Sequence, residues 1–217
     1  AARSAERKGT PEHPKEKYLE EWAARGNEAR AIGTFMHAQI EQSLLGKPCS
    51  DICPFSYHGV FVNTEKEIHI NRELDAFRRF MEDKKPIPYR TEWSICDEVR
   101  HIAGTIDFLT QNEAGEYIMY DWKRSNKIGL VGKEGFQVCS KNNYHRHAHG
   151  LLAHLDDMPY NHYCLQQNLY RHILRQHYGI DLAGMYLVVL HPDYDTYHCV
   201  PVPVMEAEVR IICSRCS

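Results

Sequence analysis

The chain has 217 residues, of which 43% are hydrophobic and 25% are charged, and its formal net charge is -3 at pH 7. This length suits one domain with a sizeable core, and the near-neutral charge means that a basic surface for nucleic acid has to be local. No apolar run is long enough to cross a bilayer and the N-terminus lacks the layout of a signal peptide, which excludes a membrane-spanning protein and indicates an intracellular one in an unspecified compartment.

The eight cysteines are spread from Cys49 to Cys216, unlike those of a small disulfide-stapled scaffold. We interpret them as reduced thiols of an intracellular protein. The chain begins Ala1-Ala2-Arg3 without a methionine. This beginning suggests a domain excised from a longer chain, for example one that also carries a helicase.

The first part of the chain is predicted to be helical. Residues 1–26 are expected to form a flexible lead-in with a short charged helix at 15–24, and residues 27–217 to form the main domain. A helix is predicted from Asn27, as its N-cap, to residue 45, with Gly46 as its stop. Residues 47–70 are expected to be irregular apart from a short strand at 60–62, and residues 71–84 form an amphipathic helix.

The second part changes to strands. Strands are predicted at 89–96, 99–110 and 117–123, the last two joined by a turn into an antiparallel hairpin. Residues 124–158 look like a loop, and a helix follows at 160–178 with Leu165, Leu169 and Ile173 as its buried stripe and Gly179 as its C-cap. Strands at 183–191 and 196–202 and a helix from Met205 complete an α+β fold, with a central mixed sheet flanked by helices.

The predicted hairpin brings two acids together. If its turn centres on Ala114, Asp107 and Asp121 lie opposite each other with Cβ atoms roughly 5 Å apart. Lys123 is two residues beyond Asp121 and emerges on the same face. Two adjacent carboxylates repel each other unless a cation lies between them, and oxygen ligands at this separation suit Mg²⁺ or Mn²⁺.

An Asp-x-Lys sequence on a strand is more often a solvated polar face than a catalytic one. Here, however, bulky apolar residues flank both acids: Ile106 and Phe108 around the first, Tyr120 and Trp122 around the second. Acids on such apolar strands are costly without a metal or a partner. This favours a metal site over a solvated face.

These residues resemble the core of the PD-(D/E)XK nuclease superfamily, and more specifically its RecB-like exonuclease branch. The resemblance rests on elements that occur in the family's order between about residue 30 and residue 178. They are Gly33-x-x-x-His37 with Glu41 one turn later, Gly104-x-x-Asp107, Asp121-Trp122-Lys123 and Gln166-x-x-x-Tyr170.

The resemblance implies an α/β/α restriction-endonuclease-like core and phosphodiester hydrolysis, with DNA as the favoured substrate, by an exonuclease-like or structure-dependent activity. It implies that His37, Asp107, Asp121 and the backbone carbonyl of Trp122 bind the metal, while Lys123 acts on the attacking water. It also implies that Gln166 and Tyr170 hold the scissile strand or support the site. Glu41, which shares a helix face with His37, and Glu92 on the preceding strand are additional candidate metal ligands.

Basic residues follow the predicted catalytic strand and indicate where nucleic acid binds. The segment from residue 123 to residue 149 contains several basic residues and a single acid, Glu134. The following helix adds two arginines. A glycine-rich basic loop is suited to grip phosphates, although a mobile solvated loop is the alternative interpretation. The candidate contacts are Arg124, Lys127, Lys133, Lys141, Arg171 and Arg175.

Two other classes of function are compatible with the sequence. One is a nucleic-acid-binding module of the same fold that has lost catalysis, which the intact Asp107, Asp121 and Lys123 argue against. The other is an interaction domain stabilised by zinc or an iron–sulfur cluster, held by the pair Cys49 and Cys53 with the pair Cys213 and Cys216. The latter pair departs from the C-terminal triple spacing of the family's cluster-binding relatives.

Overall fold

The computed structural model describes residues 14–142 and 146–214, and the chain divides into two compact units, residues 1–74 and 75–217. The N-terminal unit contains helix α2 (Lys15–Leu44), strands β1 (Ile52–His58) and β2 (Asn63–His69), and the start of helix α3 (Asn71–Lys84). Within the described residues, no helix combines the length and the apolar character that crossing a membrane requires.

Helix α2 is continuous where a boundary was expected. Gly26 and Asn27 lie inside it, so the prediction of Asn27 as an N-cap is wrong, whereas Gly46 follows the helix with a φ of +66° as expected of a stop. The predicted lead-in at 1–26 therefore has no helix end at its boundary, and its residues 1–13 lie outside the described part of the chain. A residue type that favours caps is tolerated inside a long helix whose other contacts hold it.

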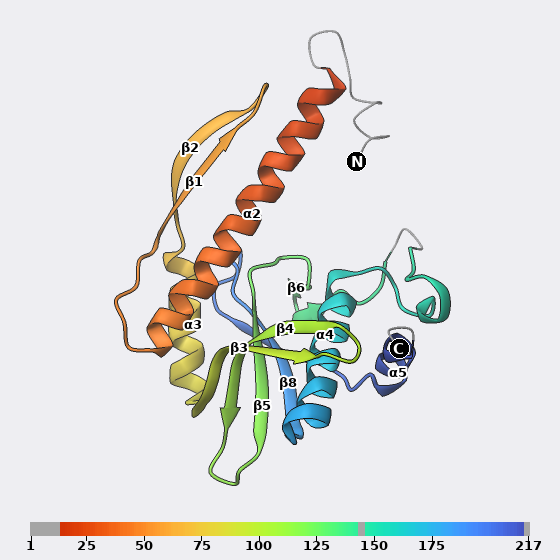
Figure 1. Cartoon of the computed structure of the whole chain (residues 1–217). Coiled ribbons are helices and arrows are strands. Elements are labelled where there is room, and N and C mark those ends of the chain that lie inside the picture. The colour runs from red at the N-terminus through yellow and green to blue at the C-terminus, as the bar shows by residue number, and fades with distance from the viewer. Residues whose placement is uncertain (1–13, 143–145, 215–217) are drawn as a thin grey trace. The chain divides into compact units, whose positions relative to one another are not determined.

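Residues 47–70 form an antiparallel hairpin, which the sequence analysis did not predict. β1 and β2 pair from Ile52↔His69 to His58↔Asn63, so the segment 60–62 expected as a strand belongs to the turn. Helix α2 lies along this hairpin (Figure 1). The carboxylate of Glu20 accepts hydrogen bonds from the backbone N–H groups of Val60, Phe61 and Val62 at 3.2, 2.9 and 2.7 Å, which satisfies the donors of the turn.

The C-terminal unit is built on a five-stranded mixed sheet of order β3-β4-β5-β8-β9. The strands are β3 (Pro88–Asp97), β4 (Ile102–Gln111), β5 (Tyr117–Lys123), β8 (Leu182–Val189) and β9 (His198–Pro201). β5 and β8 are parallel, and the other neighbours are antiparallel. Each of these strands overlaps a predicted one, which confirms the central mixed sheet flanked by helices.

Helices cover both faces of this sheet (Figure 1). On one face, Phe77 and Phe80 of α3 meet the ring of Trp122 edge-on at centroid distances of 5.4 Å. On the other face, α4 (Pro159–Ile173) packs Cys164, Tyr170 and its last residue, Ile173, against the main apolar core of the sheet. The sheet therefore separates two packed layers, and side chains of β5 point alternately into each.

The buried face of α4 differs from the predicted stripe. Leu165 and Leu169 are only half-buried, whereas Ile173 is buried as expected. A π-helical turn, η2 (Leu174–Tyr178), continues the helix and ends at Gly179 with a φ of +65°, the predicted C-cap. Helix α5 (Glu206–Cys213) is the predicted last helix.

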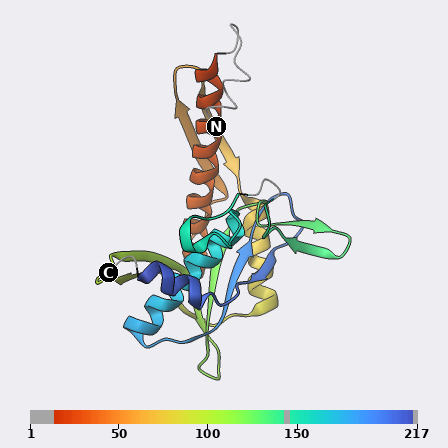
Figure 2. The same cartoon turned by 90° about the vertical axis from the view of Figure 1, so that its right-hand side faces the viewer.

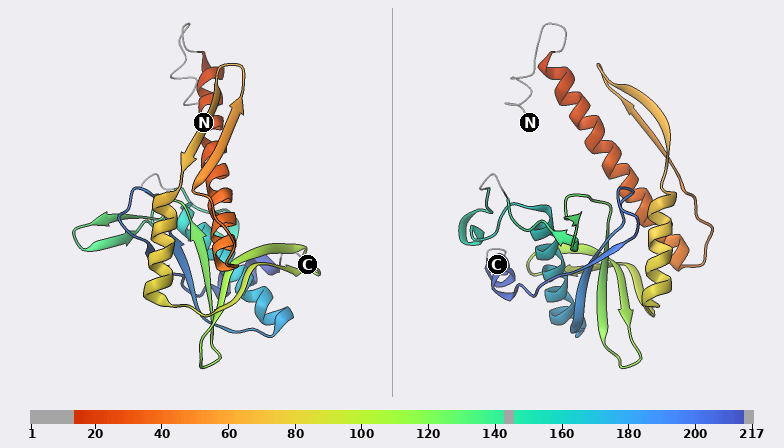
Figure 3. Two further views of the ribbon diagram at one scale, coloured as in Figure 1. Left: turned by 90° about the vertical axis from the view of Figure 1, so that its left-hand side faces the viewer. Right: turned by 180° about the vertical axis from the view of Figure 1, so that it is seen from behind.

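The segment 124–158 has more structure than the predicted loop. It contains the hairpin β6 (Gly129–Gly132) and β7 (Gly135–Val138) and the 3-10 turn η1 (Gly150–Leu152). Figures 2 and 3 show this hairpin standing away from the five-stranded sheet. Its glycine content hid the strand pattern from the sequence analysis, because glycine is depleted in strands.

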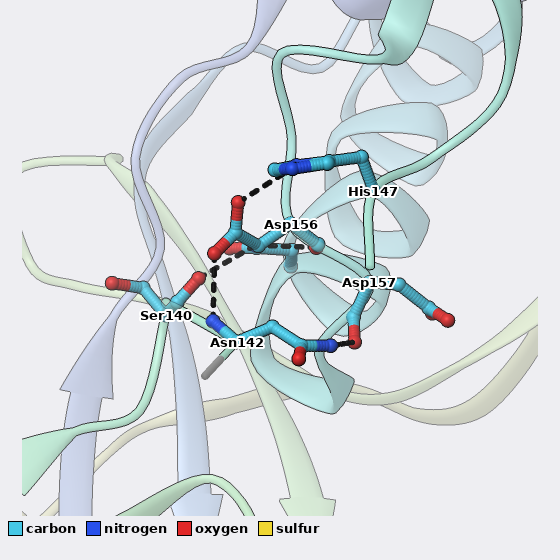
Figure 4. Close-up of polar contacts among 6 residues, drawn as sticks. Ser140, Asn142, His147, Asp156 and Asp157 are labelled. Atoms are coloured by element: carbon cyan, nitrogen blue, oxygen red, sulfur yellow. Dashed lines mark hydrogen bonds and ion pairs between the residues drawn. The ribbon is translucent and has the colours of Figure 1, made fainter. Parts of the chain in front are cut away.

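A polar network joins Ser140 and Asn142 to the residues just before and at the start of α4 (Figure 4). The Asp156 carboxylate accepts a hydrogen bond of 2.6 Å from the backbone N–H of Asn142 and lies 3.1 Å from Nδ1 of His147. The amide of Asn161 donates to the carbonyl oxygens of Ser140 at 3.0 Å and Asp156 at 2.8 Å. These bonds fasten the connection to the first turn of α4.

Candidate active site at the fork of the sheet

The two central strands separate at the acidic pair. β4 and β5 pair from Gln111↔Tyr117 to Phe108↔Tyr120, a register whose residue numbers centre on position 114 as predicted. Asp107 and Asp121 are the next residues on each strand. Beyond this point β4 stays paired with β3, while β5 stays paired with β8 through Lys123↔Val189. The fork thus opens where the two carboxylates stand.

The two carboxylates are held by different partners. Oδ2 of Asp107 accepts a hydrogen bond of 2.8 Å from the backbone N–H of Trp122. Oδ2 of Asp121 lies 2.5 Å from Nζ of Lys123. Asp107 and Asp121 are only 7% and 5% exposed, so these charges sit in a largely water-free setting where unpaired charge is costly.

Lys123 carries a stabilised positive charge. Burial by itself lowers the pKa of its ammonium, but the charges of Asp121 and then Asp107 outweigh burial and raise the pKa above its ordinary value. Nζ also lies 4.5 Å from the centroid of the Tyr163 ring, a cation–π arrangement. The lysine is therefore a fixed cation at neutral pH.

Glu92 lies beside Asp107 on the neighbouring strand. The β3–β4 register includes Thr91↔Phe108 and Trp93↔Ile106 but omits the pair between them. Glu92 has a φ of +45°, a left-handed conformation that non-glycine residues seldom adopt inside a strand. A carboxylate oxygen of Glu92 lies within 4.8 Å of one of Asp107. The structure thus adds Glu92 to Asp107 and Asp121, the two acids that the sequence analysis placed at the core of the site.

Helix α4 contributes Gln166 and Tyr170. Nε2 of Gln166 donates a hydrogen bond of 3.1 Å to the Tyr170 hydroxyl. Burial, followed by the charge of Asp121, raises the pKa of this hydroxyl, so it stays protonated. The Tyr170 ring covers Gly104, where any Cβ would overlap the ring. This contact explains why a glycine stands three residues before Asp107.

Tyr163 is a residue of this cluster that the sequence analysis missed. It precedes Gln166 by three positions and Tyr170 by seven, so the three share one face of α4. Extending the Gln166-x-x-x-Tyr170 spacing by one turn toward the N-terminus would have identified it.

His37 and Glu41 lie on α2 in the N-terminal unit, and both are half-buried. They are four residues apart within the continuous helix, so they occupy the same helix face, as expected. Their predicted part in metal binding stays a prediction.

The predicted basic residues fall into two groups. Lys127, Lys133 and Lys141 are exposed before, within and after the β6–β7 hairpin, and Arg124 is half-buried. Tyr144 and His145 lie outside the described residues. The second group is Arg171 of α4 and Arg175 of its π turn, and both pair with acids. Arg171 lies 3.4 Å from Glu206, and Arg175 lies 3.3 Å from Asp181.

The structure describes seven of the eight cysteines. Cys53, Cys164 and Cys213 are buried, whereas Cys49 and Cys96 are exposed. Cys216 lies outside the described residues. The four-cysteine site therefore stays a prediction.

No protein-family model and no curated protein matches this chain. Among solved structures it is similar to protein SSO0001, with 17% identity over 66% of this chain and a TM-score of 0.33. It is also similar to a protein of Eubacterium rectale named "putative exonuclease", with 14% identity over 66% of this chain and a TM-score of 0.37. The chain spans 55% and 48% of the lengths of these two proteins.

Proposed function

We propose that the chain is a divalent-metal-dependent nuclease that hydrolyses phosphodiester bonds of DNA, with an exonuclease-like or structure-dependent activity. The observation that carries this proposal is the pair of buried carboxylates, Asp107 and Asp121, at the fork of the sheet with the Lys123 ammonium beside them. This combination offers a cation site and a fixed positive charge at the same place.

The donor set fits a hard divalent cation. Glu92 lies beside Asp107, and Asp121 pairs with the Lys123 ammonium, so three carboxyl groups stand against one ammonium and the cluster has an excess of negative charge. Oxygen donors of this kind suit Mg²⁺ or Mn²⁺. A bound ion would neutralise the acids and polarise a phosphoryl oxygen. By the family resemblance, the Trp122 carbonyl and His37 complete the ligand set.

The surrounding side chains offer hydrogen-bond donors for a phosphodiester. The Lys123 ammonium donates to a phosphoryl oxygen and stabilises the negative charge that develops there. The Tyr170 hydroxyl accepts from Gln166, which leaves its own proton available for a phosphate oxygen. The Trp122 N–H fixes the orientation of the Asp107 carboxylate. Preorganised donors of this kind supply much of the catalysis in phosphoryl transfer.

The direct test is a cleavage assay with labelled linear and circular DNA, single- and double-stranded, and matched RNA, with EDTA, Mg²⁺ or Mn²⁺. We expect cleavage only with metal, and comparing the linear and circular substrates separates end-dependent from internal cutting. Asp107→Asn and Asp121→Asn should each abolish cleavage while retaining the folded circular-dichroism spectrum. Asp75→Asn, the same change at an exposed ion pair on α3, should leave cleavage intact.

Metal-dependent stability gives a second readout of the same assignment. A cation that binds only the folded state raises its stability by about 2.7 kcal/mol at a hundred times its Kd. We expect Mn²⁺ to raise the melting temperature of the wild-type chain and not that of Asp121→Asn. DNA binding without cleavage or metal stabilisation would identify a non-catalytic module, and zinc or a coloured cluster in the purified protein would identify an interaction domain.

A further inference from the structure

A cavity of about 370 Å³ lies on the side of α4 that carries Arg171 and Arg175. Its walls come from the β3–β4 connection, α4 with its π turn, and α5. Four arginines line it (Arg100, Arg171, Arg175 and Arg210), against one acid, Glu206. Gln166 and Tyr170, which belong to the candidate active site, do not line it. The cavity is thus a second concentration of charge, opposite in sign to the acid cluster.

Three of the four guanidinium groups are held in place by neighbouring acids. Asp97 accepts a 2.7 Å hydrogen bond from Nη1 of Arg100, while Arg171 and Arg175 keep their ion pairs with neighbouring acids. Arg210 makes no ion pair with any residue that the structure describes. Each guanidinium has five N–H donors, so a single acid contact leaves donors for a ligand. The pairs therefore orient the arginines without using up their donors.

His172 adds a buried donor or acceptor to the same cavity. Its Nε2 is buried and has no hydrogen-bond partner among the described residues. Burial, followed by the charge of Arg100, lowers the pKa of this imidazole, while Asp97 opposes and His177 reinforces the change. A buried polar atom without a partner is uncommon in folded proteins, and this one belongs to a residue of the cavity wall.

The lining chemistry selects phosphate. Planar guanidinium forks bind phosphate oxygens in pairs, which is why arginine predominates in phosphate recognition. No phenylalanine, tyrosine or tryptophan is among the described lining residues, so the cavity offers guanidinium groups in place of a large stacking platform. The amide of Asn168 is already bonded to the carbonyl oxygens of Cys164 and Pro203 and to the N–H of Met205. The arginines of the cavity are therefore suited to recognise the phosphate group of a ligand.

The location also agrees with a ligand site. The π turn η2 supplies Arg175 and Gln176 to the lining. Single π turns in helices occur frequently at functional sites, because they present side chains that a regular helix would direct elsewhere. The volume is at the lower end of the range for small-molecule pockets and can hold a group of nucleotide size.

We propose that this arginine-lined cavity is a phosphate-binding site, distinct from the candidate active site, that takes the phosphate of a nucleotide or of a nucleic-acid end. The assignment rests on the cavity, the four arginines and the unpartnered His172, and it does not depend on the proposed nuclease activity. Binding at this site should therefore persist in Asp107→Asn, which removes the proposed cleavage.

Calorimetric titration with inorganic phosphate, a nucleoside 5′-monophosphate, and short oligonucleotides with a 5′-phosphate or a 5′-hydroxyl tests the proposal. We expect phosphorylated ligands to bind, and Arg171→Gln together with Arg210→Gln to weaken binding at least tenfold. Arg78→Gln is the matched control, since Arg78 is an exposed arginine paired with Asp75 on α3. A phosphorylated oligonucleotide that binds more tightly than the mononucleotide identifies a strand end, and equal affinity identifies a free nucleotide.

Nuclear magnetic resonance supplies a site-specific readout. The imidazole signals of His172 are identified as those that are missing from the spectrum of His172→Gln. Phosphate should shift the His172 signals and raise its pKa, because an anion stabilises the imidazolium against burial and the neighbouring arginines. Failure of phosphate to bind at millimolar concentration, an unmoved His172 signal, or equal weakening in Arg78→Gln would overturn the proposal.

Discussion

Lys123 decides what kind of chemistry the acid cluster can support. The charges of Asp121 and Asp107 raise the pKa of its ammonium, and we propose that it acts as an electrostatic group and not as a general base. The stability that this charge contributes is present below the ordinary lysine pKa and is lost as the pH rises through the higher folded value. The cleavage rate should therefore not increase with pH through the deprotonation of this lysine.

We expect Lys123→Ala to lower the cleavage rate by about 10²–10³, the usual effect of removing one donor from a developing oxyanion. Lys123→Arg should retain part of the rate, because the guanidinium is also a permanent cation. Single-turnover rates at saturating Mn²⁺ make this comparison. If arginine were as inactive as alanine while binding metal and DNA normally, a proton-transfer function would replace the electrostatic one.

At the element scale, the contact of α4 with β4 rests on the absence of a side chain at Gly104. Gly104→Ala places a methyl group into the Tyr170 ring and should destabilise the fold by about 1–3 kcal/mol, the usual cost of overpacking. Urea unfolding measures this loss. The double variant with Tyr170→Leu should recover part of the stability, and its recovery identifies the ring as the obstacle.

Gly26→Ala is the matched control for that change. Gly26 lies inside α2, and a Cβ there would meet no atom within 4 Å. Alanine should therefore stabilise the chain by about 0.5–1 kcal/mol, because glycine loses more backbone entropy in a helix. A destabilising Gly26→Ala would contradict the continuous helix and restore the break expected from the sequence.

The β6–β7 hairpin and its flanks present Lys127, Lys133 and Lys141 to solvent. Changing all three to glutamine should weaken DNA binding for every sequence and flatten its salt dependence, by about 0.9 in the log–log slope for each phosphate that a lysine no longer neutralises. Binding measured between 50 and 200 mM salt gives the slope. The rate at saturating DNA should change less than the affinity.

The control for this triple variant changes Lys47, Lys84 and Lys85, which are equally exposed elsewhere. It removes the same net charge without touching the hairpin. Equal changes in slope for the two variants would mean that the overall charge of the chain, and not the hairpin, sets the affinity.

At the scale of the whole molecule, the prediction that joins the two units is metal binding by His37. If His37 is a ligand, His37→Ala should raise the metal concentration needed for half-maximal activity at least tenfold. Removing a side chain that supports a metal site typically lowers the metal affinity by about that much or more. The effect should be larger for Mn²⁺ than for Mg²⁺, because imidazole favours the transition metal. Ca²⁺ should bind yet support little cleavage.

His58→Ala is the matched control, since His58 is an exposed histidine of the same unit, paired with Asn63 and Glu65. It should leave both metal titrations unchanged. A folded His37→Ala protein with unaltered titrations for both ions would confine the site to the C-terminal unit. The proposed ligand set would then be the three acids Asp107, Asp121 and Glu92.

The sequence by itself determined the sheet hairpin and most of its acid cluster. Alternating apolar residues set the faces of the strands, and the Asn112–Gly115 turn set the register, so Asp107 and Asp121 could be matched without coordinates. Helix α3, the strands of the main sheet and the Gly179 end of the last long helix also follow from local patterns. These features depend on residues close together in the chain.

Other features were decided by the tertiary structure. β2 reads Asn-Thr-Glu-Lys-Glu-Ile-His, which lacks a regular apolar alternation, and its turn depends on Glu20, some 40 residues earlier. The left-handed Glu92 is placed by its neighbours in the sheet. The arginine cavity gathers residues from position 100 to position 214, and the sequence indicated Arg171 and Arg175 as basic contacts but not that Arg100 and Arg210 join them. Contacts between distant segments carry no local periodicity, so only the folded chain assembles them.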